Sequence, residues 1–101
     1  MSVAASYYER QMALWAVRGR DRIKSARLKE AISKSKKNIG IDIAVPEMRA
    51  RLIRAVLLNC DDRSTYPYRM LNIDFVSERD FYRRKDKFLQ DVYTNFFKFE
   101  T

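Results

Sequence analysis

Apolar side chains recur at helical spacing through the first third of the chain. Residues 3–37 contain no proline and are rich in Ala, Arg, Lys, Glu and Leu, so they predict one long helix or two collinear helices. Tyr8, Met12 and Trp15 follow one another at spacings of four and three and form an apolar stripe. A break in this helical stretch should fall at Gly19, because glycine disfavours a helix interior.

The helical pattern gives way to alternation at residues 39–45. Asn38 and Gly40 should end the preceding helix, since such residues adopt the left-handed conformation found at helix ends. Four β-branched residues then alternate with smaller or polar ones: Ile39, Ile41, Ile43 and Val45. No second alternating run is present to pair with them. We therefore expect an extended linker pressed onto the core, or an edge strand that pairs with a second copy.

A second helical region begins at Pro46, a residue that suits the first position of a helix. Apolar residues on one face predict a core helix to about Cys60: Met48, Leu52, Ile53, Val56 and Leu57. Cys60 is expected to be a small apolar packing residue. Residues 61–64 read as a polar, solvated turn rather than a metal site, because two neighbouring carboxylates lack a third acidic partner.

Two further helices complete the expected fold. Residues 65–72 predict a short helix with Met70 and Leu71 facing inward, and Ser77 should cap a last helix that runs to about Phe97. The inner face of that helix comprises Phe81, Phe88, Leu89, Val92, Tyr93, Phe96 and Phe97. The predicted fold is all-α: a basic N-terminal helical segment (1–38), an extended linker (39–45) and a three-helix, helix-turn-helix-like domain (46–101).

The basic residues concentrate at the N-terminal end. The 101 residues include 21 Lys and Arg against 13 Asp and Glu, a net charge of +8, and residues 1–38 alone hold ten basic and three acidic side chains. Such a local excess repels itself unless an anion lies nearby, and a phosphate backbone is the usual one.

The missing residue types exclude much chemistry. Without His and with one Cys, the chain cannot build a Cys/His zinc site, a Ser-His-Asp triad or a Cys-His pair. We therefore expect no catalytic residues, no metal ion and no cofactor. No uncharged stretch approaches membrane-spanning length, and no signal peptide is visible, so a cytoplasmic protein without membrane contact is expected.

The last helix holds the strongest functional pattern. A short helix, a tight turn, a capping serine and a helix with a basic outer side are typical of a helix-turn-helix, whose last helix enters the major groove of DNA. The candidate DNA-binding residues are Ser77, Glu78, Arg79, Tyr82, Arg83, Arg84 and Lys87. An outward Arg suits guanine, whereas Arg84, Lys85 and Lys87 suit phosphates. The alternative is a salt-bridged surface helix with the pairs Asp80–Arg84 and Lys87–Asp91.

The stretch from Leu71 to Leu89 resembles the C-terminal helix-turn-helix of small phage transcriptional regulators of the RinA and ArpU type, which is similar to region 4 of sigma factors. The residues that match are Ser77, Phe81, Tyr82, Arg83, Lys87, Phe88 and Leu89. The resemblance implies control of phage late genes through promoter DNA in the bacterial host cytoplasm, with host RNA polymerase as a further partner. The chain departs from the family just before, at residues 66–71, where the Ile-Ala pair and Leu-Gly turn are replaced.

Two other surfaces have alternative interpretations. Arg18, Arg20, Lys24 and Arg27 either contact the DNA backbone or make the chain a protein-interaction module, an inhibitor or assembly factor that binds an acidic partner. The C-terminal aromatics either pack in the core or form the seam of a homodimer; they are Tyr93, Phe96, Phe97 and Phe99.

Overall fold

The computed structural model describes the backbone of residues 3–96 and the side chains of residues 7–96. Over this range the protein is all-helical and contains no strand, which confirms the all-α part of the predicted fold class. Its elements, in chain order, are α1 (Val3–Arg18), the 3₁₀ turn η1 (Arg20–Arg22), α2 (Ala26–Ile39), α3 (Pro46–Asp61), the 3₁₀ turn η2 (Tyr68–Met70) and α4 (Glu78–Phe96).

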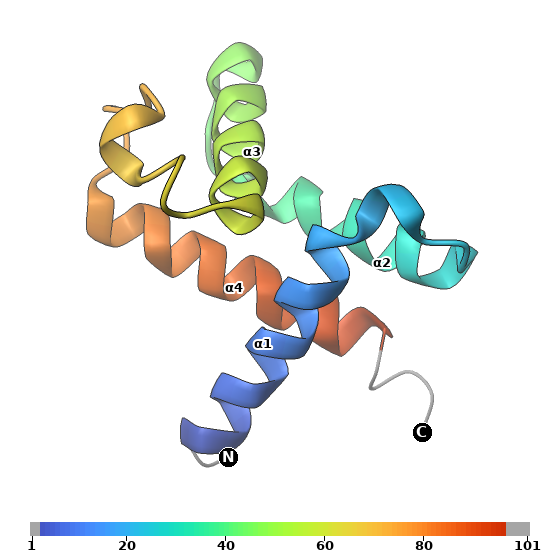
Figure 1. Cartoon of the computed structure of the whole chain (residues 1–101). Helices are drawn as coiled ribbons and strands as arrows, with labels where there is room; N and C mark the ends of the chain where they lie inside the picture. The colour runs from blue at the N-terminus through green and yellow to red at the C-terminus, as the bar shows by residue number, and fades with distance from the viewer. Residues whose placement is uncertain (1–2, 97–101) are drawn as a thin grey trace.

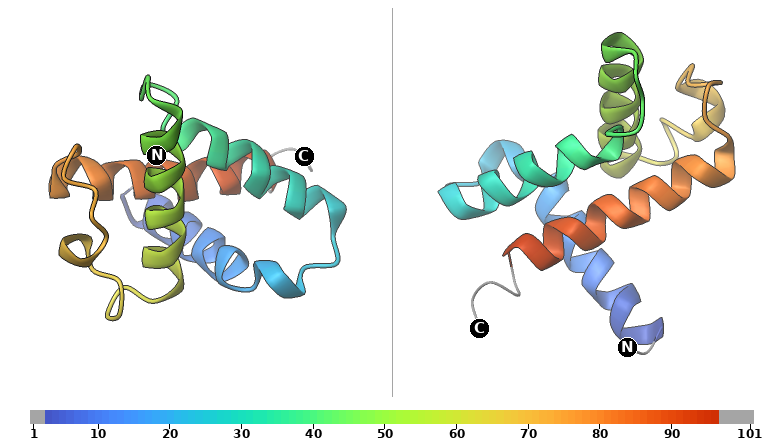
Figure 2. Two further views of the ribbon diagram at one scale, coloured as in Figure 1. Left: turned by 90° about the horizontal axis from the view of Figure 1, so that it is seen from above. Right: turned by 180° about the vertical axis from the view of Figure 1, so that it is seen from behind.

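Helix α4 is the central element. α1 and α2 pack against different sides of it, and α3 stands across its N-terminal half (Figure 1, Figure 2). α2 runs antiparallel to α4, since Asn95 near the end of α4 bonds to Ser35 whereas Arg84 near its start bonds to the carbonyl of Ile39. The buried face of α4 consists of Phe81, Lys85, Phe88, Leu89 and Val92.

The N-terminal segment is not one straight helix. Gly19 ends α1, and Ser25 then caps α2 by accepting a hydrogen bond from the N–H of Leu28 at 3.3 Å. The break was expected at Gly19, but the prediction of a single helix or two collinear ones was wrong (Figure 1). Folding back lets both α1 and α2 bury apolar surface against α4, and such packing contributes more than helix propensity.

The predicted apolar stripe of α1 points to solvent. Ala13 and Val17 are fully buried instead, whereas Tyr8, Met12 and Trp15 are largely exposed. The small side chains at 13 and 17 permit a close approach to α4, which large aromatic side chains on that face would prevent. The sequence therefore predicted correctly that this segment is helical, but the prediction of which face is buried was wrong.

The connection between α2 and α3 is a turn rather than an extended segment or an edge strand. Ile39 is the last residue of α2, the N–H of Ile43 donates to the Gly40 carbonyl at 2.9 Å, and Ile41 is exposed. Gly40 has a φ of −122°, outside the left-handed region that we expected. Glycine is favoured here by space, because a Cβ at this position would lie 2.8 Å from Cγ of Arg49.

Helix α3 matches the prediction. Leu52 and Val56 are fully buried, and Met48 and Leu57 are half-buried on the same face. Cys60 is fully buried, as expected of a packing residue, and this burial raises the pKa of its thiol to about 11.

The expected helix over residues 65–72 is reduced to the three-residue turn η2. The Asp62 carboxylate accepts hydrogen bonds from residues 64 and 65, and the Asn59 amide donates to the Tyr66 carbonyl, so local side-chain bonds compete with a helix. The Tyr68 hydroxyl donates to the Val76 carbonyl and closes the loop. Met70 is exposed rather than buried. A loop therefore replaces the middle helix of the expected helix-turn-helix.

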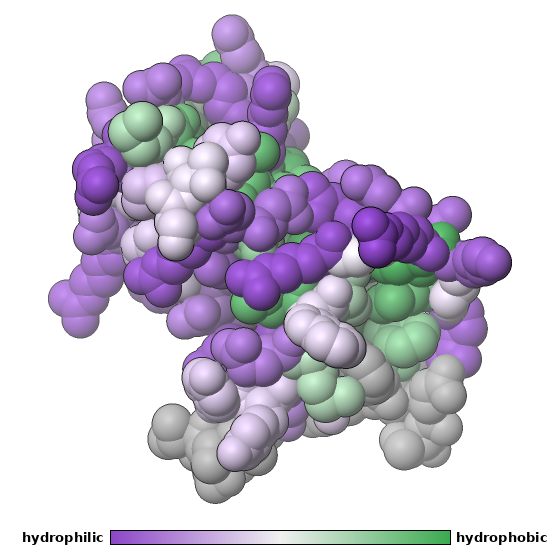
Figure 3. All heavy atoms as spheres, viewed as in Figure 1, coloured by the Kyte–Doolittle hydropathy of each residue, from purple (hydrophilic) through white to green (hydrophobic). Residues whose placement is uncertain are grey.

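All four α-helices contribute to one hydrophobic core. Val17 of α1, Ile32 of α2, Val56 of α3 and Phe81 of α4 belong to the same buried cluster, with Ile73 from the loop. The N-terminal segment thus packs on the rest of the fold and does not project as an arm. Hydrophilic side chains cover much of the face seen in Figure 3.

Candidate nucleic-acid interface

The start of α4 is set by Ser77. Its Oγ accepts a hydrogen bond from the N–H of Asp80 at 3.1 Å, which confirms the predicted cap. Glu78 is the first helical residue and is exposed. The N-terminal end of α4 therefore faces solvent with its first turn fixed.

Three basic residues share the open side of α4. Arg79, Arg83 and Lys87 follow one another at four-residue spacing and are all exposed. The side chains of Arg83 and Lys87 are 80% and 73% exposed. We call Arg79, Arg83 and Lys87 the basic stripe; its exposure agrees with the outward position predicted from the sequence.

Two members of the basic stripe form ion pairs along the helix. Arg83 bonds to Asp80 at 2.6 Å, and Lys87 bonds to Asp91 at 3.0 Å, the second of which was predicted. Burial raises the pKa of Asp80, but hydrogen bonds from Arg83 and Arg84 outweigh it, so that pKa lies below its usual value. The carboxylates of Asp80 and Asp91 are only 22% and 19% exposed, whereas the two cations face solvent and keep further N–H donors that can bind a phosphate.

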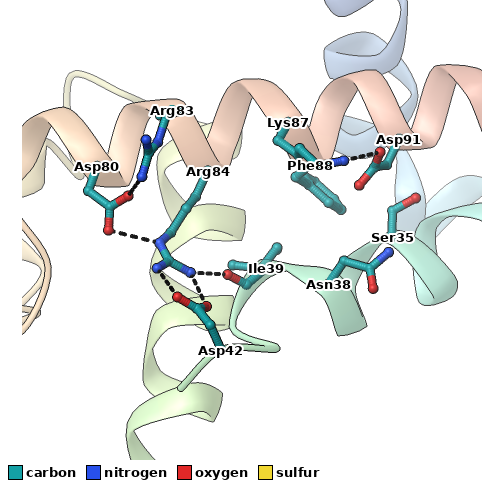
Figure 4. A pocket seen from close by; sticks show the side chains of 10 residues that line it. All are labelled: Ser35, Asn38, Ile39, Asp42, Asp80, Arg83, Arg84, Lys87, Phe88 and Asp91. Atoms are coloured by element: carbon teal, nitrogen blue, oxygen red, sulfur yellow. Dashed lines mark hydrogen bonds and ion pairs between the residues drawn. The ribbon is translucent and has the colours of Figure 1, made fainter. Parts of the chain in front are cut away.

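Arg84 does not belong to the exposed surface. Its guanidinium binds both oxygens of Asp42 at 2.7 Å, the carboxylate of Asp80 at 3.0 Å and the Ile39 carbonyl at 2.8 Å (Figure 4). The Asp80 pair was predicted, but the assignment of Arg84 to DNA was wrong, because its donors are used within the fold. The hydrogen bonds from Arg84 lower the pKa of Asp42 to about 2.

A hollow of about 250 Å³ lies between α2 and α4 beside this network. Its lining includes Arg83 and Lys87 as well as the carboxylates of Asp42, Asp80 and Asp91 (Figure 4). Each of these carboxylates already pairs with a cation. In the part of the chain that the structure describes, no group of three or more His, Cys, Asp or Glu side chains forms a metal-binding cluster.

Tyr82 and Lys85 also lie toward the interior. Tyr82 is half-buried, its ring centroid is 5.1 Å from that of Phe81, and the guanidinium of Arg63 lies 4.4 Å from its centroid. Lys85 is 8% exposed and donates to the side-chain oxygen of Asn59 at 2.8 Å. Lys85 therefore serves the core rather than a phosphate, contrary to the prediction.

The basic residues of the N-terminal segment divide into two groups. Arg18 donates from Nε to the Cys60 carbonyl at 2.8 Å, and Arg20 binds both oxygens of Asp61 at 2.5 and 2.8 Å. These two residues join the end of α1 to the end of α3. Lys24 is exposed, and Arg27 is exposed with its guanidinium 5.9 Å from the centroid of the Phe96 ring. The four side chains therefore do not act as one free basic surface.

The structure places two of the C-terminal aromatics in the fold. Tyr93 packs against the core and is half-buried, as is Phe96. Phe97 and Phe99, which were also assigned to the inner face or a dimer seam, lie outside the described residues.

One basic surface was missed by the sequence analysis. Arg51 and Arg54 on α3 line a hollow of about 300 Å³ together with Tyr66 and Met70 of the following loop. Residues 62–77 bring these side chains together. The spacing of residues in the sequence does not indicate that the arginines of α3 meet this loop, since the path of the loop depends on tertiary hydrogen bonds.

Across residues 3–96, no helix is both long and apolar enough to cross a membrane. Comparison of the chain with protein-family models, with curated proteins and with solved structures finds no match in any of the three.

Proposed function

We propose that this protein binds double-stranded DNA by placing the open side of α4 in the major groove. The observation that supports the proposal is the basic stripe. Its outermost residues, Arg79 and Lys87, lie eight positions apart, or about 12 Å along the helix axis. They project from the N-terminal half of α4, where no other element covers them. A major groove about 12 Å wide admits one α-helix.

The members of the stripe would have different roles. Arg79 and Arg83 are long and exposed, so they can reach guanine edges or phosphates, whereas Lys87 is a point charge suited to a phosphate. Ser77 and Glu78 stand at the helix start, where free backbone N–H groups favour an anion. Arg83 and Lys87 would keep their carboxylate partners and use their remaining N–H donors on phosphates.

The likeness to phage regulators of the RinA and ArpU type supports the same proposal and suggests promoter DNA as the target, with host RNA polymerase as a further partner. The residues that match the family pattern are exposed or buried as a helix-turn-helix requires. Arg83 and Lys87 face solvent, while Phe81, Phe88 and Leu89 are buried. The difference is that α1 and α2, rather than a preceding short helix, support α4.

The protein-interaction alternative has less support. It relied on Arg18, Arg20, Lys24 and Arg27 as a free basic surface, yet Arg18 and Arg20 are bound to the end of α3. Arg27 also contacts the Phe96 ring within the fold. DNA binding through α4 is therefore the function that the geometry supports better.

Fluorescence anisotropy of a labelled duplex across a salt series tests the proposal. The double variant Arg79→Ala/Arg83→Ala should bind at least about tenfold more weakly and lower the slope of log K against log salt by about two, since each phosphate contact contributes about one. The matched control is Arg22→Ala/Arg69→Ala, which removes the same charge from exposed positions elsewhere.

The control variant distinguishes a specific DNA-binding site from non-specific attraction by the net positive charge. Equal losses in both double variants would mean that the net charge of +8 binds any polyanion, and the proposal would fail. Heparin as a competitor gives a second criterion. A groove-reading site should keep a preference for certain duplexes over both heparin and random DNA.

A further inference from the structure

Helix α1 exposes a row of large apolar side chains. Tyr7, Tyr8, Met12 and Trp15 are 52%, 66%, 49% and 81% exposed, and we call them the α1 strip. The rings of Tyr7 and Tyr8 meet edge to face, 5.7 Å between centroids. In Figure 3 the surface along α1 is pale to green between purple hydrophilic side chains. A contiguous exposed patch of this kind marks an interaction site.

The α1 strip is uncharged, although a third of the chain is charged. The charged residues between positions 7 and 17 are Glu9 and Arg10, and both turn toward α4. Glu9 accepts from Gln90 at 2.8 Å, and Arg10 lies 3.9 Å from Asp86. The strip offers a charged partner no side chain with which to form an ion pair. The surface that complements it is another uncharged apolar helix face.

We propose that a second copy of this chain covers the α1 strip, with the two α1 helices antiparallel about a two-fold axis between Gln11 and Met12. Tyr8 and Trp15 are equally distant along the chain from that axis. Each Tyr8 therefore meets Trp15 of the partner subunit, and the interface is self-complementary, as a two-fold axis requires. The spacing of Tyr8, Met12 and Trp15 by four and three is typical of paired helices.

The shape of the surface fits this arrangement. A shallow hollow of about 530 Å³ is lined by Gln11, Met12, Trp15 and Ala16, and the small Ala16 leaves space for an aromatic ring beside Trp15. The N-terminal half of α1 extends past α4 in Figure 1 and in the right panel of Figure 2, so a second α1 can approach it.

The available area sets the strength of the association. Aromatic side chains bury about 150–250 Å² each, so the exposed parts of the strip amount to about 500 Å² per copy. Two copies would bury about 1,000 Å², the lower end for a specific interface. The dimer should therefore be weak. Because each copy has a charge of +8, added salt should strengthen it by screening the repulsion, whereas salt weakens DNA binding.

Sedimentation velocity over a concentration series measures the association. Tyr8→Ser and Trp15→Ser should each raise the dimer Kd by about tenfold or more, as loss of an interface aromatic does. Met70→Ser is the matched control, since Met70 is 64% exposed in the η2 turn and should leave Kd unchanged. Trp15 is the single tryptophan, so its emission should shift to shorter wavelength as the dimer forms.

Cross-linking with a short bis-maleimide tests the orientation. Gln11→Cys lies at the axis and should cross-link, whereas Ala16→Cys should not, because its two copies would be about 13 Å apart along the helices. The native Cys60 is buried and does not compete.

Two results would overturn the proposal. The first is a protein that stays monomeric with unchanged tryptophan emission at high concentration and high salt. The second is cross-linking of Ala16→Cys as efficient as that of Gln11→Cys. Neither result bears on DNA binding by the basic stripe, which is assayed with dilute protein.

Discussion

At the scale of single residues, neighbours in the sequence have opposite roles. Arg83 and Arg84 are adjacent basic residues of α4, yet the first is exposed and the second is held by Asp42 and Asp80. The sequence predicted the pairs within the helix, Asp80–Arg84 and Lys87–Asp91, because their spacing is fixed by helix geometry. It did not predict the Asp42 contact, because those residues are 42 positions apart and meet only after folding.

The Asp42–Arg84 pair should make stability depend on acid pH. The pKa of Asp42 is about 2 in the folded protein against 3.8 for the free side chain. A lowered folded-state pKa gives stability that is present above pH 3.8 and is lost as the pH falls toward 2. Urea unfolding between pH 7 and 2 should show this decline, and Asp42→Asn should be less stable at pH 7 with a shallower acid dependence.

Asp62 provides the control for that titration. Hydrogen bonds from Thr65 and Ser64, with a smaller contribution from the charge of Arg18, also lower the pKa of this carboxyl group in the loop after α3. Asp62→Asn should therefore change the acid dependence without affecting the contact between α2 and α4. Identical pH profiles for Asp42→Asn and the unmodified protein would contradict the assignment.

At the scale of elements, the sequence predicted which segments are helical better than which faces they bury. α3 and α4 begin at Pro46 and next to Ser77, because proline and a capping serine are local signals. The buried face of α1 was predicted wrongly, since the large apolar residues gave the stronger pattern while Ala13 and Val17 make the contact. The helix over 65–72 was not found, because side-chain bonds of the loop replaced it.

The turn between α2 and α3 offers a test at this scale. Gly40→Ala places a methyl group 2.8 Å from Cγ of Arg49, a position near the backbone that cannot simply swing away. Arg49 also donates from Nε and Nη2 to the Ile43 carbonyl. We expect a loss of about 1–3 kcal/mol in the free energy of unfolding, typical of overpacking, measured by urea denaturation.

Gly19→Ala is the matched control for that substitution. A Cβ at this position would meet only backbone carbonyl oxygens, at 3.7 and 3.9 Å. It should be neutral or slightly stabilising, because alanine lowers the entropy of the unfolded chain. A similar loss in both variants would show that backbone conformation, rather than the space beside Arg49, explains the need for glycine at 40.

At the scale of the whole molecule, the three sequence segments share one core. The sequence prediction separated residues 1–38 from the rest of the chain because they are basic. The distribution of charge along a chain does not indicate which segments pack together. Cys60 lies where these parts meet: it is fully buried in α3, and Arg18 at the end of α1 bonds to its carbonyl. The tertiary arrangement therefore could not be derived from periodicity and charge alone.

Thiol labelling of Cys60 should report on opening of the whole fold. Burial raises its pKa to about 11, so little reactive thiolate exists at pH 8. We expect labelling by a disulfide reagent to proceed at the rate set by global unfolding, with the same dependence on urea. Ala16→Cys, whose thiol lies on the outer side of α1, should add a rapid phase. Labelling of Cys60 that is fast and insensitive to urea would show that α1 detaches by itself.

The close approach of Gly40 to Arg49 has an evolutionary consequence. Because the absence of a side chain at one site makes room for the other, the two positions should not change independently. In any sequence descended from the same ancestor, a larger residue at 40 should occur with a shorter one at 49, even though the two lie nine positions apart. Such paired replacement would show that related proteins keep the sharp bend between α2 and α3, even where the rest of their sequences has diverged.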